Sequence, residues 1–303
     1  MRTRILTGAV LLSVLFPLII IQHPICEVLF AVVVVFISTV GTFEYLNGAY
    51  KSNGKINPVL KKYRYLVAFC SGVIAFLCCN ATYNMCHEND FIYHIYPMIA
   101  FMISVVVILF AMLWTKDSKA EDIANCIVGL TYSGLLLGYA FSLRYFEPNN
   151  INQTFIHLNG RQSFMFVYTI VLLTDTFAYL VGRKWGKRKM APTISPKKSV
   201  EGAIGGLVAG IIFGVSILFI YKIVRTTELL VLIILAGAVI SGLISCAVQF
   251  GDLVESKFKR SFDVKDFGKI LPGHGGILDR FDSFIYSGII FYIVCLVIEI
   301  ALI

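Results

Sequence analysis

The residues best suited to chemistry are concentrated between positions 251 and 283, in the segment GDLVESKFKRSFDVKDFGKILPGHGGILDRFDS. Six carboxylates are interleaved there with six lysines and arginines. Carboxylate oxygens are ligands for Mg²⁺, while lysine and arginine neutralise phosphate groups. A solvated charged loop would need neither the glycines nor the single histidine of this segment. The pattern therefore indicates metal-assisted chemistry on a phosphate-bearing substrate.

Glycines and aspartates in the second half of this segment provide further means of binding ions. Gly273, Gly275 and Gly276 have no side chain, so their backbone N–H groups can approach phosphate oxygens closely. Asp279 and Asp282 are three residues apart at the predicted start of a helix. There they would share one face and lie at the positive end of the helix dipole.

Two other polar features lie upstream. Asp175 is inside an apolar run, eight residues before Arg183, which places it roughly 12 Å into a membrane at the helical rise per residue. An ionisable group at that depth is costly and usually marks a site, although a purely structural pairing is the alternative. The run Ser195-Pro196-Lys197-Lys198-Ser199 offers hydroxyl and ammonium donors for phosphate. By itself a short basic run is weak evidence, since cytoplasmic loops are commonly basic.

The elements that position these residues are predicted to be membrane-spanning helices. Of the 303 residues, 58% are hydrophobic and only 15% are charged, whereas soluble domains carry about 25% charged residues. Nine apolar runs each approach the roughly 20 residues that a helix needs to cross a bilayer. They cover residues 5–22, 26–46, 64–83, 91–114, 123–145, 163–182, 203–224, 229–250 and 281–303. The predicted fold is an all-α polytopic bundle, because backbone groups in lipid must pair within their own segment.

The distribution of basic residues predicts the orientation of this bundle. With a cytoplasmic amino terminus and an external carboxyl terminus, 22 of the 26 lysines and arginines face the cytoplasm. The first run is interpreted as a retained helix, because no small-residue cleavage site follows it. The net charge of +8 then lies on the cytoplasmic face, where it would attract anionic lipids or polyanionic substrates. Nucleic-acid binding is not expected, because no soluble domain presents a groove.

Several residues in the apolar runs are assigned structural roles. Gly202, Gly206, Gly210 and Gly214 recur every four residues, which is typical of close helix packing within a bundle or across a dimer. Glu44, near the inner end of the second run, is expected to reach the membrane interface. The eight cysteines form no CxxC pair and are assigned no function.

The segment from Ser256 to Asp282 resembles the signature of the phosphatidate cytidylyltransferase family. The signature positions are filled, at the family's spacing, by Ser256, Phe258, Lys259, Arg260, Lys265, Asp266, Gly268, Pro272, His274, Gly275, Gly276, Asp279, Arg280, Phe281 and Asp282. The resemblance extends to the segments around Asp175, Asp252, the Ser-Pro-Lys-Lys run and Glu201-Gly202. The chain departs from the family at Phe177, where glycine is usual, and at Val200, where tryptophan is usual. Neither departure removes a charged group.

The resemblance implies an Mg²⁺-dependent reaction of CTP with phosphatidic acid that forms CDP-diacylglycerol and pyrophosphate. It implies Asp252 and Asp279 as the metal-holding pair, with Asp282 beside them and Asp175 as a further acidic contributor. A second cation such as K⁺ is an option. The basic residues that would contact phosphate or the head group are Lys197, Lys198, Lys259, Arg260, Lys265 and Arg280. The other expected contacts are made by Ser195, Ser256, His274 and the backbone of Gly275 and Gly276.

A division of the chain and two alternative functions complete the prediction. Residues 1–160 would form five spans, and residues 161–303 a catalytic region of four spans with basic cytoplasmic loops at 183–202 and 251–280. The compact chain, in which no transit peptide is recognised, predicts a bacterial inner-membrane enzyme, and the basic loops predict a site on the cytoplasmic side. A homodimer is an expectation from the family and the glycine series. A CTP-dependent polyprenol kinase would share the nucleotide site but release CDP. A transporter would distribute its charges along a pathway through the bilayer, whereas these acids gather at one face.

Overall fold

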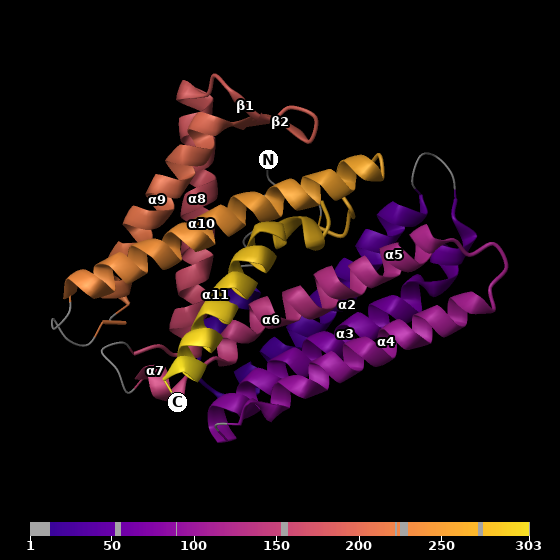
Figure 1. The fold of residues 1–303 in the computed structure, drawn as a ribbon, viewed down its shortest axis with the longest axis horizontal. Coiled ribbons are helices and arrows are strands. Elements are labelled where there is room, and N and C mark those ends of the chain that lie inside the picture. Colours follow the sequence, from indigo (N-terminus) through magenta and orange to yellow (C-terminus); the bar gives the residue numbers. More distant parts are fainter. Residues whose placement is uncertain are drawn as a thin grey trace. The chain divides into compact units, whose positions relative to one another are not determined.

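The computed structural model describes residues 13–51, 56–88, 90–152, 157–221, 223–224, 230–271 and 275–302. Almost all regular structure in these ranges is helical (Figure 1). The first elements are α2 (Pro24–Tyr50), α3 (Pro58–Glu88), η2 (Phe91–His94), α4 (Ile95–Leu113), α5 (Ala120–Gly129), η3 (Leu130–Leu136), α6 (Leu137–Ser142) and η4 (Leu143–Tyr145). The later elements are α7 (Asn149–Asn152), α8 (Gly160–Trp185), β1 (Lys189–Ala191), β2 (Ser195–Ser199), α9 (Val200–Ile220), α10 (Leu230–Ser261), η5 (Leu278–Arg280) and α11 (Asp282–Ala301).

Eight helical segments in the described ranges are long and apolar enough to cross a bilayer. They coincide with the predicted runs from the second to the ninth, which confirms the all-α polytopic fold class. Residues 5–12 of the first run, 5–22, lie outside the described residues, and its described part is helical over residues 13–20. The orientation of the two termini stays a prediction.

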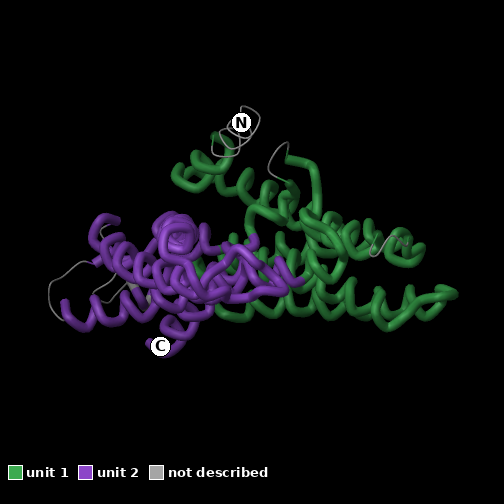
Figure 2. The backbone as a smooth tube through the Cα atoms, turned by 90° about the horizontal axis from the view of Figure 1, so that it is seen from above, with its two compact units in different colours: residues 1–142, 258–281 green, residues 143–257, 282–303 purple. Residues whose placement is uncertain are grey.

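The chain divides into two compact units, which are described separately (Figure 2). Unit 1 comprises residues 1–142 and 258–281, and unit 2 comprises residues 143–257 and 282–303. The segment 258–281, which carries much of the signature, therefore belongs to the same unit as the amino-terminal helices. The predicted division at residue 160 separated amino-terminal spans from a catalytic region, and it stays a prediction.

In unit 1, small residues let α2, α3 and the η3 turn pack closely. Ser38 Oγ on α2 donates hydrogen bonds to the carbonyl oxygens of Ser133 (2.7 Å) and Ser71 (3.0 Å). A Cβ added at Gly138 would lie 2.9 Å from the Cα of Ala75, so only glycine allows this approach of α6 to α3. The Ser38 hydroxyl is thereby satisfied inside an apolar bundle, where an unpaired polar group is costly.

In unit 2, the glycine series confirms its predicted packing role. Figure 1 shows α8 and α9 side by side, and a Cβ at Gly206 would lie 2.8 Å from the carbonyl oxygen of Thr174 on α8. A Cβ at Gly214 would meet Ser241 on α10 at a distance of 2.5 Å from its Cβ. The series therefore joins three helices of one unit, which is the within-bundle alternative of the prediction. Homodimerisation stays a prediction.

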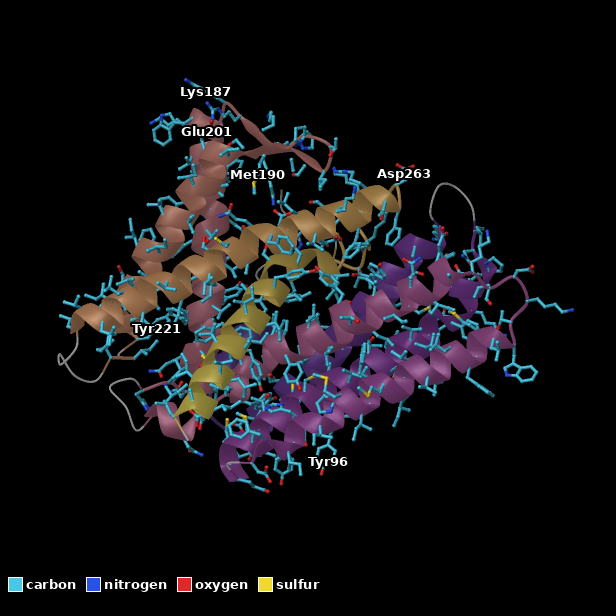
Figure 3. All side chains as sticks on the ribbon, viewed as in Figure 1. Tyr96, Lys187, Met190, Glu201, Tyr221 and Asp263 are labelled. Atoms are coloured by element: carbon cyan, nitrogen blue, oxygen red, sulfur yellow. The ribbon has the colours of Figure 1, made fainter. Side chains whose placement is uncertain are left out.

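The segment after α8 contains an antiparallel hairpin that the sequence did not predict. Strands β1 and β2 pair Lys189 with Ser199 and Ala191 with Ser195. The carboxylate of Glu201 accepts hydrogen bonds from the backbone N–H groups of Lys187 (3.0 Å) and Arg188 (3.2 Å). Figure 3 shows Lys187 and Glu201 at this end of α8 and α9. The hairpin is thereby fastened to the first turn of α9.

Helix α10 is longer than its apolar run. It continues to Ser261, so the first eleven residues of the predicted loop 251–280 are helical. Lys259 and Arg260 occupy its last turn, where positive charge stabilises the carboxyl end of the helix dipole. At the other end of the segment, α11 begins at Asp282, and Asp279 lies in the preceding 3₁₀ turn η5. The expectation that Asp279 and Asp282 share one helix face is therefore wrong.

Candidate active site

Three aspartates from three helices of unit 2 form the first candidate cluster. Asp175 on α8 interacts electrostatically with Asp252 on α10, with Asp282 at the start of α11 and with Lys198 on β2. Lys198 Nζ lies 2.5 Å from Asp252 Oδ2. Asp175, Asp252, Asp282 and Lys198 are called the unit 2 cluster below. The sequence predicted all four as site residues.

The unit 2 cluster borders a cavity of about 330 Å³. Asp175, Lys197, Lys198 and Asp252 all line it, together with Arg183 from the end of α8. Cavities of this size with a few convergent polar groups are typical of small-molecule sites. The mixture of carboxylates and cations suits a phosphate group accompanied by a metal ion.

The hairpin positions the lysines of this cavity. Ser199, the last residue of β2, caps α9, and its Oγ accepts a hydrogen bond from the backbone N–H of Gly202 (3.2 Å). Gly182 on α8 leaves room for Ser199, because a Cβ there would lie 3.0 Å from Ser199 Oγ. The polar run therefore ends in a fixed cap, and the side chain one residue earlier, that of Lys198, reaches Asp252.

The two predicted serines have different surroundings. Ser256 Oγ donates a hydrogen bond of 3.4 Å to Asp252 Oδ1, one helical turn away on α10. Ser256 is therefore associated with the unit 2 cluster. Ser195 starts strand β2, where it pairs with Ala191, and it is not among the residues that line the cavity.

The second candidate cluster is centred on Asp279 in unit 1. Lys259 Nζ lies 2.9 Å from Asp279 Oδ1, and the Asp279 side chain is only 1% exposed. Asp279 Oδ2 also accepts hydrogen bonds from the backbone N–H groups of Gly276 (2.7 Å) and Phe267 (3.1 Å). Asp279 therefore closes the segment that follows α10 and includes η5, called the signature loop below (residues 262–280). Its described part is 262–271 and 275–280.

Glu44 contacts the same loop from α2, and it was not predicted as a site residue. Its side chain is buried at 2% exposure, and Oε2 accepts a hydrogen bond of 3.1 Å from the backbone N–H of Leu278. The expectation that Glu44 reaches the membrane interface is therefore wrong. A carboxylate inside an otherwise apolar span was the signal that could have identified it, because such a group needs donors when it is buried.

Gly275 has a backbone conformation that explains its residue type. Its φ is +87°, in the region where residues with a Cβ are strained. Leu271 N–H donates a hydrogen bond of 3.0 Å to the carbonyl oxygen of Gly275, which folds the loop back on itself. Arg260, Lys265 and Arg280 are exposed around this loop, as phosphate-binding groups should be. His274 lies outside the described residues.

The residues present suit a hard divalent cation, although no ready-made metal site is seen. Among the described residues, no three His, Cys, Asp or Glu side chains are close enough together to hold an ion as they stand. The unit 2 cluster nevertheless offers three carboxylates against one lysine, which is a donor set for Mg²⁺. Asp279 already has three partners, so at most one of its roughly four acceptor positions is left. The pairing of Asp252 with Asp279 as metal ligands stays a prediction.

Comparisons with known proteins agree with the chemistry of these residues. Residues 2–298 match the model of a family described as the cytidylyltransferase family. A phosphatidate cytidylyltransferase of Staphylococcus haemolyticus is 38% identical over 183 residues, which cover 60% of this chain and 63% of that protein. The phosphatidate cytidylyltransferases of Staphylococcus saprophyticus and Staphylococcus aureus are 40% and 39% identical over similar lengths, again 63% of each relative.

Proposed function

The chain belongs to the cytidylyltransferase family, and on this basis we propose that it transfers the cytidylyl group of CTP to phosphatidic acid. The products are CDP-diacylglycerol and pyrophosphate. The observation that carries the proposal is the unit 2 cluster, where residues of the family's pattern meet at one cavity. The relatives that match 60% of the chain are named for this reaction.

The reaction is a single displacement at phosphorus. A phosphate oxygen of phosphatidic acid attacks the α-phosphorus of CTP in line and forms a new P–O bond, while the bond from that phosphorus to the bridging oxygen breaks. Pyrophosphate carries the electron pair away. Phosphatidic acid is already anionic at neutral pH, so the protein need not remove a proton. Positioning and charge neutralisation therefore supply most of the catalysis.

The residues that line the cavity beside the unit 2 cluster can both position a phosphate group and neutralise its charge. Lys197 and Lys198 offer ammonium donors at its edge, and Arg183 adds a guanidinium group. Asp175 and Asp252 on the opposite helices would repel an anion on their own, which is why a cation is part of the proposal. Mg²⁺, when bound, would neutralise charge on the triphosphate, with Asp175, Asp252 and Asp282 as its holders.

The signature loop of unit 1 carries further residues that the family pattern assigns to this reaction. Lys259 is held against Asp279 at the end of α10, and the side chains of Arg260, Lys265 and Arg280 are exposed. The site is proposed to face the cytoplasm of a bacterial cell from its inner membrane, because the basic loops at 183–202 and 251–280 are the expected cytoplasmic segments. CTP would reach it from the cytosol and the lipid from the bilayer.

Product analysis tests this function directly. The purified protein in detergent–lipid micelles would receive CTP, phosphatidic acid and Mg²⁺, and the products would be separated and identified. CDP-diacylglycerol and pyrophosphate are expected. Release of CDP with a phosphorylated lipid would assign the chain to the lipid kinases instead, and absence of CTP turnover in a folded sample would favour transport.

A matched pair of variants shows whether the measured activity belongs to this site. Asp252→Asn removes one charge of the unit 2 cluster and should abolish product formation. Asp263→Asn makes the same chemical change in the same segment at an exposed residue. Asp263 has a φ of +55°, which asparagine tolerates as well as aspartate, so this control should keep wild-type activity.

A further inference from the structure

Glu44 on α2 is bound to the backbone of the signature loop rather than to another side chain. Its Oε2 accepts a hydrogen bond of 3.1 Å from the backbone N–H of Leu278. Leu278 immediately precedes Asp279 in the chain. A single carboxylate from the amino-terminal half therefore holds the backbone directly before Asp279.

Two glycines of the loop leave space for this carboxylate because they have no Cβ. A Cβ at Gly276 would lie 2.5 Å from Glu44 Oε2, and a Cβ at Gly268 would overlap Glu44 Oε1. Both glycines occupy positions of the signature, so part of the signature is explained by the space that Glu44 needs. Only a backbone without a side chain can approach a buried carboxylate from two sides in this way.

Glu44 and Asp279 both accept hydrogen bonds from the backbone of residues 276–278. Asp279 accepts the N–H of Gly276, and Glu44 accepts the N–H of Leu278, two residues further along the chain. The two carboxylates also interact electrostatically, and Lys259 forms an ion pair with Asp279. Two backbone donors within three residues are thus bonded to two carboxylates, which holds this part of the loop at both ends.

We propose that Glu44 is a positioning residue of the active site: it fixes residues 276–278 and, through them, the placement of Asp279 and Lys259. This role rests on the proposed function, since it assigns Glu44 to the same reaction. Charge-assisted bonds to a buried carboxylate are strong enough to hold a loop. A displacement of about 1 Å at reacting groups lowers the rate by about 100-fold, so loss of these bonds should reduce kcat far more than substrate affinity.

The decisive variants separate the acceptor function of Glu44 from its charge. Glu44→Gln keeps the length of the side chain and an acceptor oxygen for Leu278, so kcat should stay within about threefold of the wild type. Glu44→Ala removes the acceptor and should lower kcat by about 100-fold while KM for CTP changes little. A residue that contributes only its charge would lose kcat equally in Glu44→Gln and Glu44→Ala, because both variants remove the charge.

Glu299 on α11 provides the matched control. It is also a carboxylate at 2% exposure, and it accepts a backbone N–H, that of Ile151 at 2.9 Å. It lies about 25 Å along α11 from Asp282 at the helical rise per residue, away from the candidate site. Glu299→Ala should lower thermal stability while kcat per folded molecule is kept. Equal loss of kcat in Glu299→Ala and Glu44→Ala would overturn the proposal.

A second readout does not depend on the reaction. Hydrogen exchange of the backbone amide of Leu278 should accelerate at least tenfold in Glu44→Ala and stay near the wild-type rate in Glu44→Gln. If the wild type makes no CDP-diacylglycerol, the proposed function fails, and the exchange experiment still tests the contact. If Glu44→Ala does not fold, the test uses Gly268→Ala, whose new Cβ would overlap the Glu44 carboxylate. Activity should fall in Gly268→Ala, and the double variant Gly268→Ala with Glu44→Asp should regain part of it, because aspartate has the shorter side chain. Wild-type kcat in folded Glu44→Ala, or no restoration in that pair, would contradict the positioning role.

Discussion

Lys198 Nζ on strand β2 lies 2.5 Å from Asp252 Oδ2 on helix α10. This contact joins two segments that are more than fifty residues apart in the chain, and both members line the same cavity. The lysine side chain is 26% exposed and the aspartate side chain is 35% exposed, so the pair is open to a ligand from the cavity. An incoming phosphate would compete with Asp252 for Lys198, and an incoming cation would compete with Lys198 for Asp252.

Lys198→Met should therefore lower kcat/KM for CTP by about 100-fold, because a preorganised positive charge is lost from a site where charge develops. The side-chain length is nearly kept, so folding should be little affected. Steady-state kinetics with CTP as the varied substrate measure the change. Lys189→Met on strand β1 of the same hairpin is the control, and its kinetics should match those of the wild type. Equal losses in both variants would assign the effect to the hairpin as a whole.

Asp279→Asn should impair stability as well as activity. The Asp279 side chain is 1% exposed and holds Lys259 together with two backbone N–H groups. Removing one member of a buried ion pair leaves the other charge uncompensated and typically costs about 3 kcal/mol or more. We expect a lower midpoint of thermal unfolding in detergent and no CTP turnover. Asp266→Asn, an exposed change in the same loop, should leave the midpoint unchanged.

The sequence predicted the helices well because each must satisfy its backbone within an apolar run of about 20 residues. It also predicted Asp175 as a site residue, since an aspartate inside an apolar run has few uses other than a site. The metal-holding role of Asp252 and Asp282 was predicted from the resemblance to the family, and Lys198 from its basic run. The contact between Lys198 and Asp252 was not predictable, because it depends on a hairpin whose residues have no strand pattern.

Glu44 shows where reasoning from one segment is insufficient. Its position near the end of an apolar run is compatible both with an exposed carboxylate and with a buried one. The distinction depends on the backbone N–H of Leu278, which is more than 200 positions away in the chain. The glycines of the signature had a similar ambiguity: Gly276 was expected to serve an anionic substrate, and the structure places a carboxylate of the protein against it.

Removal of divalent cations provides a test of the unit 2 cluster. A chelator should abolish turnover, and Mg²⁺ should restore it, because Asp175, Asp252 and Asp282 repel one another without a cation. Asp175→Asn leaves Asp252 and Lys198 in place, so this variant should be active at saturating Mg²⁺. The Mg²⁺ concentration that gives half-maximal activity should be about tenfold higher than in the wild type. Activity measured against Mg²⁺ concentration checks this. Full activity in chelator, or an unchanged Mg²⁺ requirement in Asp175→Asn, would exclude this cluster as the metal site.

Gly275→Ala tests whether the backbone of the signature loop is tuned for function. Gly275 has a φ of +87°, and an alanine there would be strained by about 1–2 kcal/mol. The strain can be relieved only by moving the loop next to Asp279, whose Oδ2 would lie 3.0 Å from the new Cβ. We therefore expect turnover to fall by at least tenfold while the midpoint of thermal unfolding decreases only slightly.

The matched control for this change is Gly242→Ala on α10. A Cβ at Gly242 would meet only Ile211 at 3.6 Å, an ordinary van der Waals distance, and alanine favours a helix over glycine by about 1 kcal/mol. Gly242→Ala should keep full turnover and raise the unfolding midpoint slightly, as measured on the same preparation. If Gly275→Ala behaves in the same way as Gly242→Ala, the positive φ of Gly275 has no part in the reaction, and the signature loop tolerates displacement beside Asp279.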